Sequence, residues 1–152
     1  MSATDFDFLH GDWTLSHRLL KERLTGCQEW ESFESSMTCR PILGGAGNMD
    51  EAEFASRGFH GATVRLYDKD ADTWSLFWLD SRTGRIEPPV TGTFADGVGT
   101  FTGPDEHQGK PVLCRFLWTG IEPDSVHWAQ ALSEDDGASW ETNWYMDLTR
   151  IR

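Results

Sequence analysis

Large aromatic side chains and a few polar ones recur in this chain at spacings that could build a ligand-binding wall. Residues an even number apart point to one face of a β-strand, as Trp78 and Asp80 would, or Trp128 and Gln130. An apolar, aromatic wall with one or two polar groups is what a small-molecule cavity needs. The predicted ligand-binding residues are Trp78, Asp80, Phe116, Trp118, Trp128, Gln130 and Trp144.

In this interpretation the partner is a small apolar or aromatic molecule. The tryptophans stack on it, while Asp80 and Gln130 fix its polar end. The alternative is a solid core, in which Asp80 ends its strand at a turn beside Ser81 and Arg82. The face that lines the interior stays open at this point, because one β-bulge moves a strand's inward residues to the other side.

A carboxyl group among tryptophans also suggests an enzyme. Burial disfavours the charged form, so Asp80 is expected to have a raised pKa and could protonate or orient a ligand. The second hypothesis is therefore a cyclase-type or isomerase-type enzyme that acts by orientation and one acid or base, Asp80 or Glu53. No G-x-S-x-G elbow or local Cys–His pair is present, so no catalytic residue is assigned.

Histidine spacing offers a third hypothesis. The five histidines have no HxH or HExxH spacing, so the sequence predicts no metal site and no resident cofactor. His127 lies between Val126 and Trp128 in a predicted strand and faces away from both. If that face were the barrel interior, His127 could be an axial haem ligand; the alternative is a surface or core histidine.

One acidic run resembles a metal-binding loop only in part. Asp68, Asp70 and Asp72 have the spacing of the first ligands of an EF-hand. Thr73 stands where that loop needs glycine, and Leu79 stands where it needs glutamate. A solvated hairpin loop is therefore expected.

These side chains must be positioned by β-structure, because the hydrophobic periodicity is mostly two. A short helical turn is expected within residues 4–11, and a polar loop at 103–109. Turn-forming residues separate ten candidate strands. These strands are 13–20, 28–39, 49–54, 62–67, 73–79, 87–94, 98–102, 112–119, 126–132 and 140–149.

This pattern predicts a single all-β domain over residues 1–152, an antiparallel up-and-down barrel of about eight to ten strands. A meander of neighbouring strands favours a barrel over a sandwich, since closure removes exposed edges. Pro88 and Pro89 cannot both lie in a central ladder, so the strand at 87–94 is an edge, a bulge or partly loop. An exposed edge there would be a fourth hypothesis, a partner-binding module.

Charge and composition restrict the partners and the compartment. The formal net charge is -12, and no basic stripe is present, which argues against nucleic acids and anionic membranes as partners. No apolar run approaches the ~20 residues of a membrane span. The first residues, MSATDFDFLHGDW, lack the basic and apolar regions of a secretory signal, so a cytoplasmic location is expected. Cys27, Cys39 and Cys114 are interpreted as reduced and mostly buried.

A structural motif lies at the start of the first candidate strand. Gly11-Asp12-Trp13 is a G-x-W element, and Arg150 and Arg152 end the last strand. A tryptophan covered by an arginine from the final strand would seal one end of a barrel through a cation–π contact. In this respect the chain resembles the calycin superfamily of lipocalins and fatty-acid-binding proteins, and the role implied for the motif is structural.

Further stretches resemble one lipocalin-like bacterial family, called DUF1579-like. They are the opening 5–13, the segment 40–45, the hairpin 66–81 and the C-terminal 133–140, and together they span nearly the whole chain. The resemblance implies a β-barrel and no particular activity. The segment 133–140 also matches S-x-D-x-G-x-x-W, the Asp-box turn, which stabilises a hairpin.

Overall fold

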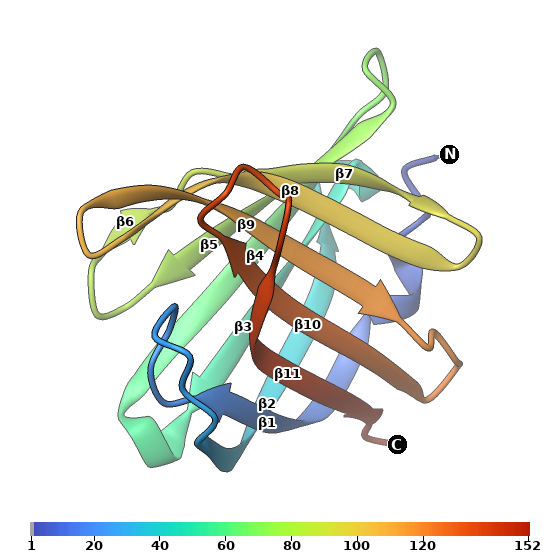
Figure 1. Cartoon of the computed structure of the whole chain (residues 1–152). Helices are drawn as coiled ribbons and strands as arrows, with labels where there is room; N and C mark the ends of the chain where they lie inside the picture. The colour runs from blue at the N-terminus through green and yellow to red at the C-terminus, as the bar shows by residue number, and fades with distance from the viewer. Residues whose placement is uncertain (1) are drawn as a thin grey trace.

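Ten long antiparallel strands form a closed barrel in the computed structural model, which describes residues 2–152 (Figure 1). The strands are β1 (Gly11–Leu20), β2 (Trp30–Ile42), β3 (Gly47–Phe54), β4 (Phe59–Asp68), β5 (Thr73–Asp80), β7 (Val90–Ala95), β8 (Val98–His107), β9 (Lys110–Thr119), β10 (Ser125–Ser133) and β11 (Glu141–Arg150). A two-residue strand, β6 (Arg85–Ile86), pairs only with the end of β5. The predicted up-and-down barrel is confirmed.

Closure follows from the order of pairing. Successive long strands pair with each other around the sheet, and β1 pairs with β11 from Trp13–Arg150 to Leu19–Trp144. The contact between β5 and β7 is the shortest of the ring, with three residues on each strand. Pro88 and Pro89 lie between β6 and β7, outside the ladder, because proline has no N–H to donate.

The N-terminal segment plugs one end of the barrel. A 3-10 helix, η1 (Asp7–Leu9), precedes β1, so the expected helical turn is confirmed. It follows Phe6, whose fully buried ring contacts the rings of Trp74, Phe94 and Trp118 at centroid distances of 4.8 to 5.8 Å. This aromatic cluster fills the plugged end, and its member Trp118 also lines the cavity.

The G-x-W element seals the same end. The Arg150 guanidinium carbon lies 4.2 Å from the centroid of the Trp13 ring, and its N–H groups donate to the carbonyl oxygens of His10, Phe8 and Pro123. Gly11 has φ +117, and a Cβ there would lie 2.7 Å from Nη1 of Arg150. The close approach and the positive φ explain why glycine precedes this tryptophan.

Three local features differ from the sequence expectations or refine them. The predicted polar loop 103–109 is wrong, because β8 and β9 continue as a hairpin that turns at Gln108 and Gly109. Trp140 precedes β11 and lies under Arg115, whose guanidinium carbon is 4.5 Å from its ring. Asp68 accepts hydrogen bonds from two backbone N–H groups of its turn, at 3.0 and 3.1 Å, as expected for a hairpin loop.

None of the helices within residues 2–152 has the length and apolar character needed to cross a membrane.

Candidate functional site

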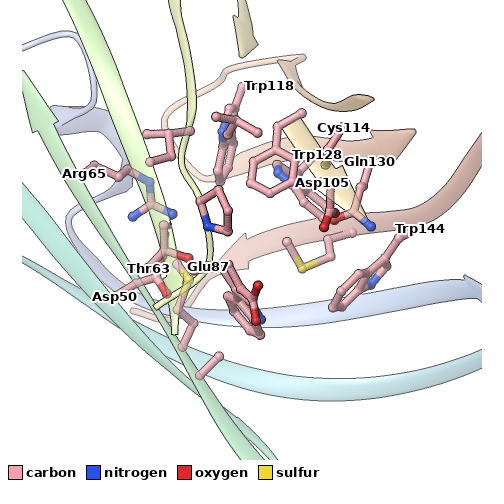
Figure 2. A pocket seen from close by; sticks show the side chains of 18 of the residues that line it. Asp50, Thr63, Arg65, Glu87, Asp105, Cys114, Trp118, Trp128, Gln130 and Trp144 are labelled. Atoms are coloured by element: carbon pink, nitrogen blue, oxygen red, sulfur yellow. Dashed lines mark hydrogen bonds and ion pairs between the residues drawn. The ribbon is translucent and has the colours of Figure 1, made fainter. Parts of the chain in front are cut away.

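A cavity of about 350 Å³ lies inside the barrel (Figure 2). Its walls come from strands around the ring and are rich in aromatic side chains, because the inward positions of β5, β9, β10 and β11 carry them. Six of the seven predicted ligand-binding residues line it: Trp78, Phe116, Trp118, Trp128, Gln130 and Trp144. These six side chains therefore face the interior, as alternation along the strands predicts, while their binding of a ligand stays a prediction.

The aromatic wall is held by edge-to-face ring contacts. Phe116 and Trp128 have centroids 5.0 Å apart at an interplanar angle of 67°, and Trp128 and Trp144 are 5.4 Å apart at 88°. Rings in this geometry place the positive edge of one on the negative face of the next. The wall is thus ordered by its own contacts.

Asp80 does not belong to the cavity wall, and its predicted role is corrected. It is 8 % exposed and ends β5, where Oδ1 accepts hydrogen bonds from the backbone N–H and the Nε–H of Arg82. Arg82 Nη2 donates to Oδ2 at 2.7 Å. These hydrogen bonds hold the pKa of Asp80 below its usual value, whereas a raised pKa was expected. The turn interpretation of Asp80 is the correct one.

Glu53 and His127 lie on the outer surface. Glu53 is exposed on β3, between the inward-facing Ala52 and Phe54. The His127 side chain is 56 % exposed, and its Nδ1 lies 2.5 Å from Oδ1 of Asp147. Neither side chain reaches the interior, so Glu53 is no acid or base for a bound molecule and His127 is no haem ligand inside the barrel.

His17 was not predicted from the sequence. It holds Trp144, a residue of the aromatic wall, by a hydrogen bond. His17 is 1 % exposed; its Nδ1 accepts a hydrogen bond from the Trp144 indole N–H at 3.0 Å. Its Nε2 lies 2.7 Å from Oγ of Ser35, and Phe33 stacks on its ring at 4.4 Å. Burial, together with the positive charge of Arg57, lowers the pKa of His17 to about 4. The neutral ring can therefore accept from Trp144 at neutral pH. The inward parity of Trp13 and Leu15 on β1 was the signal that could have found it.

A buried ion pair, also missed, lies in the inner part of the cavity. Arg65 Nη2 donates to Oδ2 of Asp50 at 2.5 Å, and Nη1 donates to the Asn48 carbonyl oxygen at 3.1 Å. The Arg65 guanidinium carbon also lies 5.5 Å from the Trp118 ring. Arg65 and Asp50 are both 3 % exposed. Alternation along β3 and β4 puts both on inward faces, but composition alone does not reveal that they pair.

Cys114, which lines the cavity, keeps its thiol protonated at neutral pH and is therefore not a nucleophile. Burial raises the pKa of Cys114 to about 12 and that of Cys39 to about 11. Since the thiolate is the reactive form, both behave as small apolar residues at neutral pH. All three cysteines are free, as expected. Across residues 2–152, no three His, Cys, Asp or Glu side chains are grouped so that they could hold a metal ion.

Comparison with known proteins adds no assignment: no protein-family model matches the chain, and no curated protein matches it significantly.

Proposed function

We propose that this protein binds a small apolar or aromatic molecule inside its barrel, as a lipocalin-like protein. The observation that carries the proposal is the aromatic-lined cavity of about 350 Å³ within a closed barrel. This volume lies at the lower end of the range of small-molecule sites, and its mixture of apolar walls and a few polar groups is typical of them. Membership of the DUF1579-like family and a cytoplasmic location remain part of the proposal.

The wall can bind through contact area and ring geometry. A flat ligand that replaces water against Trp128 and Trp144 gains from burial of apolar surface, at ~25 cal/mol per Å². Each favourable ring–ring contact adds about 0.5–1.5 kcal/mol. Gln130, 9 % exposed and part of the lining, supplies a polar group for orientation. These contributions support micromolar to millimolar affinity for a ligand of this size.

The positions of Asp80 and Glu53 argue against the acid–base enzyme that was predicted from these two residues. The two carboxylates considered as catalytic groups, Asp80 and Glu53, are engaged in a turn and exposed on the outside. General acid–base catalysis requires the group to lie within hydrogen-bond reach of the reacting proton. A molecule in this cavity has neither group at that distance, which favours a binding protein over the proposed acid–base enzyme.

Native mass spectrometry of the untagged protein tests the proposal. We expect an excess mass that is lost on denaturation, and that is also lost when Ala52→Phe fills the cavity that Ala52 lines. Ala129→Phe is the matched control, because Ala129 lies between the inward-facing Trp128 and Gln130 on β10 and points outward. Circular dichroism verifies that both variants fold.

If the purified protein carries no occupant, the same variants are titrated with 2-phenylethanol by calorimetry. Heat from the wild type and Ala129→Phe, but none from Ala52→Phe, is the expected result. Equal binding by both variants, or no heat from any of the three proteins, would contradict a site inside the barrel.

A further inference from the structure

We propose that the ligand is an organic cation: an aromatic or apolar body that carries a protonated amine or a quaternary ammonium group. This inference rests on the proposed function, because it names the ligand class of the same cavity. It follows from the charges that line the cavity, from the aromatic rings among them and from one amide oxygen that is accessible in the cavity.

Two of the three cavity arginines are already neutralised by carboxylates. Arg65 is paired with Asp50 at 2.5 Å, and both side chains are almost completely buried. Arg82 is paired with Asp80 at 2.7 Å. A ligand carboxylate would therefore find no free cation in these two, and binding would require it to displace a carboxylate that is already in place.

Three other carboxylates line the cavity without a cation of their own. They belong to Glu87, Asp105 and Glu106, and Figure 2 labels the first two among the aromatic side chains. Within residues 2–152, none of the three has an ion pair of 4.0 Å or shorter. The remaining arginine of the lining, Arg23, likewise has no ion pair of 4.0 Å or shorter among the described residues. Three carboxylates thus face one guanidinium, and the cavity carries excess negative charge.

The ring faces complement this charge. A cation is attracted to the negative face of an indole or phenyl ring, and the attraction grows when water is excluded. Trp78, Trp128 and Trp144 line this cavity. Figure 2 shows Trp128 and Trp144 there together with Glu87 and Asp105. Aromatic faces combined with carboxylates form the chemistry that recognises alkylammonium groups.

Gln130 adds a hydrogen-bond acceptor to the cavity lining. Its side chain is nine-tenths buried and lines the cavity, and its amide nitrogen donates to the Asn143 carbonyl oxygen at 2.9 Å. No hydrogen bond to its own carbonyl oxygen comes from any part of the chain that the structure describes. This oxygen is not among the buried side-chain atoms that lack a partner, so it is accessible from the cavity, where a ligand or water can supply an N–H or O–H group. An ammonium group has the donors that this oxygen lacks.

Three probes of equal shape and different charge test the inference: 2-phenylethylammonium, 2-phenylethanol and phenylacetate. Binding is followed through the tryptophan indole signals in ¹H–¹⁵N spectra, which separate Trp128 and Trp144 in the cavity from Trp30 on β2, where Arg18 stacks from outside. We expect the cation to bind about tenfold more tightly than the alcohol, and the anion to bind weakest. Glu87→Gln and Asp105→Asn should each remove most of this preference for the cation over the alcohol.

Glu51→Gln is the matched control, because Glu51 is exposed on β3 and carries the same charge outside the cavity. If the alcohol binds as tightly as the cation, or if Glu51→Gln lowers the preference as much as Glu87→Gln, the inference is overturned while a binding cavity stands. If none of the probes shifts a cavity indole signal, the proposed function fails together with the inference.

Discussion

The indole N–H of Trp144 donates to Nδ1 of His17 across 3.0 Å, from β11 to the neighbouring β1. This hydrogen bond fixes the His17 tautomer, since the ring must be neutral at Nδ1 and can donate only through Nε2 to Ser35. It also fixes the plane of a tryptophan that lines the cavity. Protonation of the buried His17 at Nδ1 would therefore remove the hydrogen bond that orients Trp144 in the cavity wall.

Acid should weaken the fold through His17. The unfolded chain binds a proton at this ring below about pH 6.5, whereas the folded protein binds it only near pH 4. The free energy of unfolding therefore falls as pH decreases from 6.5 to 4, by up to about 3 kcal/mol. Urea unfolding at several pH values measures this. His17→Gln should lose that slope and the exposed His60→Gln should keep it; an unchanged slope in His17→Gln would contradict the assignment.

The arginine that covers Trp13 should contribute strongly to stability. Arg150→Ala removes a cation–π contact and leaves three backbone carbonyl oxygens without their donor, so we expect a loss of about 2–4 kcal/mol. Arg152→Ala is the control, because Arg152 is 68 % exposed and its pair with Asp124 lies at the surface. Guanidinium unfolding compares the two variants, and equal stabilities would refute the sealing role.

Removing one partner of the Asp50–Arg65 ion pair should destabilise the fold more than replacing both partners. Asp50→Asn leaves the Arg65 guanidinium buried without its counter-charge, and we expect about 3–5 kcal/mol of destabilisation. The double variant Asp50→Asn with Arg65→Met removes both charges and should recover much of that loss. Thermal unfolding of the single and double variants measures the difference. A double variant less stable than the single one would show that the charge of Arg65 is not the cause.

A binding protein and an acid–base enzyme respond differently to two substitutions. Asp80→Asn should leave binding of 2-phenylethanol unchanged, because Asp80 lies outside the cavity, and should lower stability by about 1 kcal/mol through loss of its turn contacts. Trp128→Ala should weaken binding at least tenfold, because it removes the ring between Phe116 and Trp144. Calorimetry measures both variants, and binding lost in Asp80→Asn but kept in Trp128→Ala would reverse the proposed site.

Local patterns were enough to predict the barrel, because alternation and turn residues are written in short stretches. Trp13 and Arg150 could be matched across the whole chain only through the meander, which makes the first and last strands neighbours. Parity also identified the aromatic wall. Alternation gave the wrong role for Asp80. Its position faces inward, but its carboxylate is bound by Arg82, two residues further along the chain.

The polar part of the site was not predictable in this way. Two contacts show this: Arg65 with Asp50, and His17 with Trp144. Each depends on which inward positions of different strands lie at the same level along the barrel axis. Strand register sets these levels, and no short motif in the sequence specifies the register. The charged lining at Glu87 and Asp105 was missed for another reason: Glu87 lies between two strands, and Asp105 was expected in a loop where alternation gives no direction.

The most direct test of the central claim is a crystal structure of the protein grown with excess 2-phenylethylammonium. We expect electron density for the probe inside the barrel, with its ring beside Trp128 and Trp144 and its nitrogen toward Glu87, Asp105 or Gln130. Density confined to the outer surface, or an interior filled by rearranged side chains with no room for the probe, would contradict the claim that this barrel encloses a binding site.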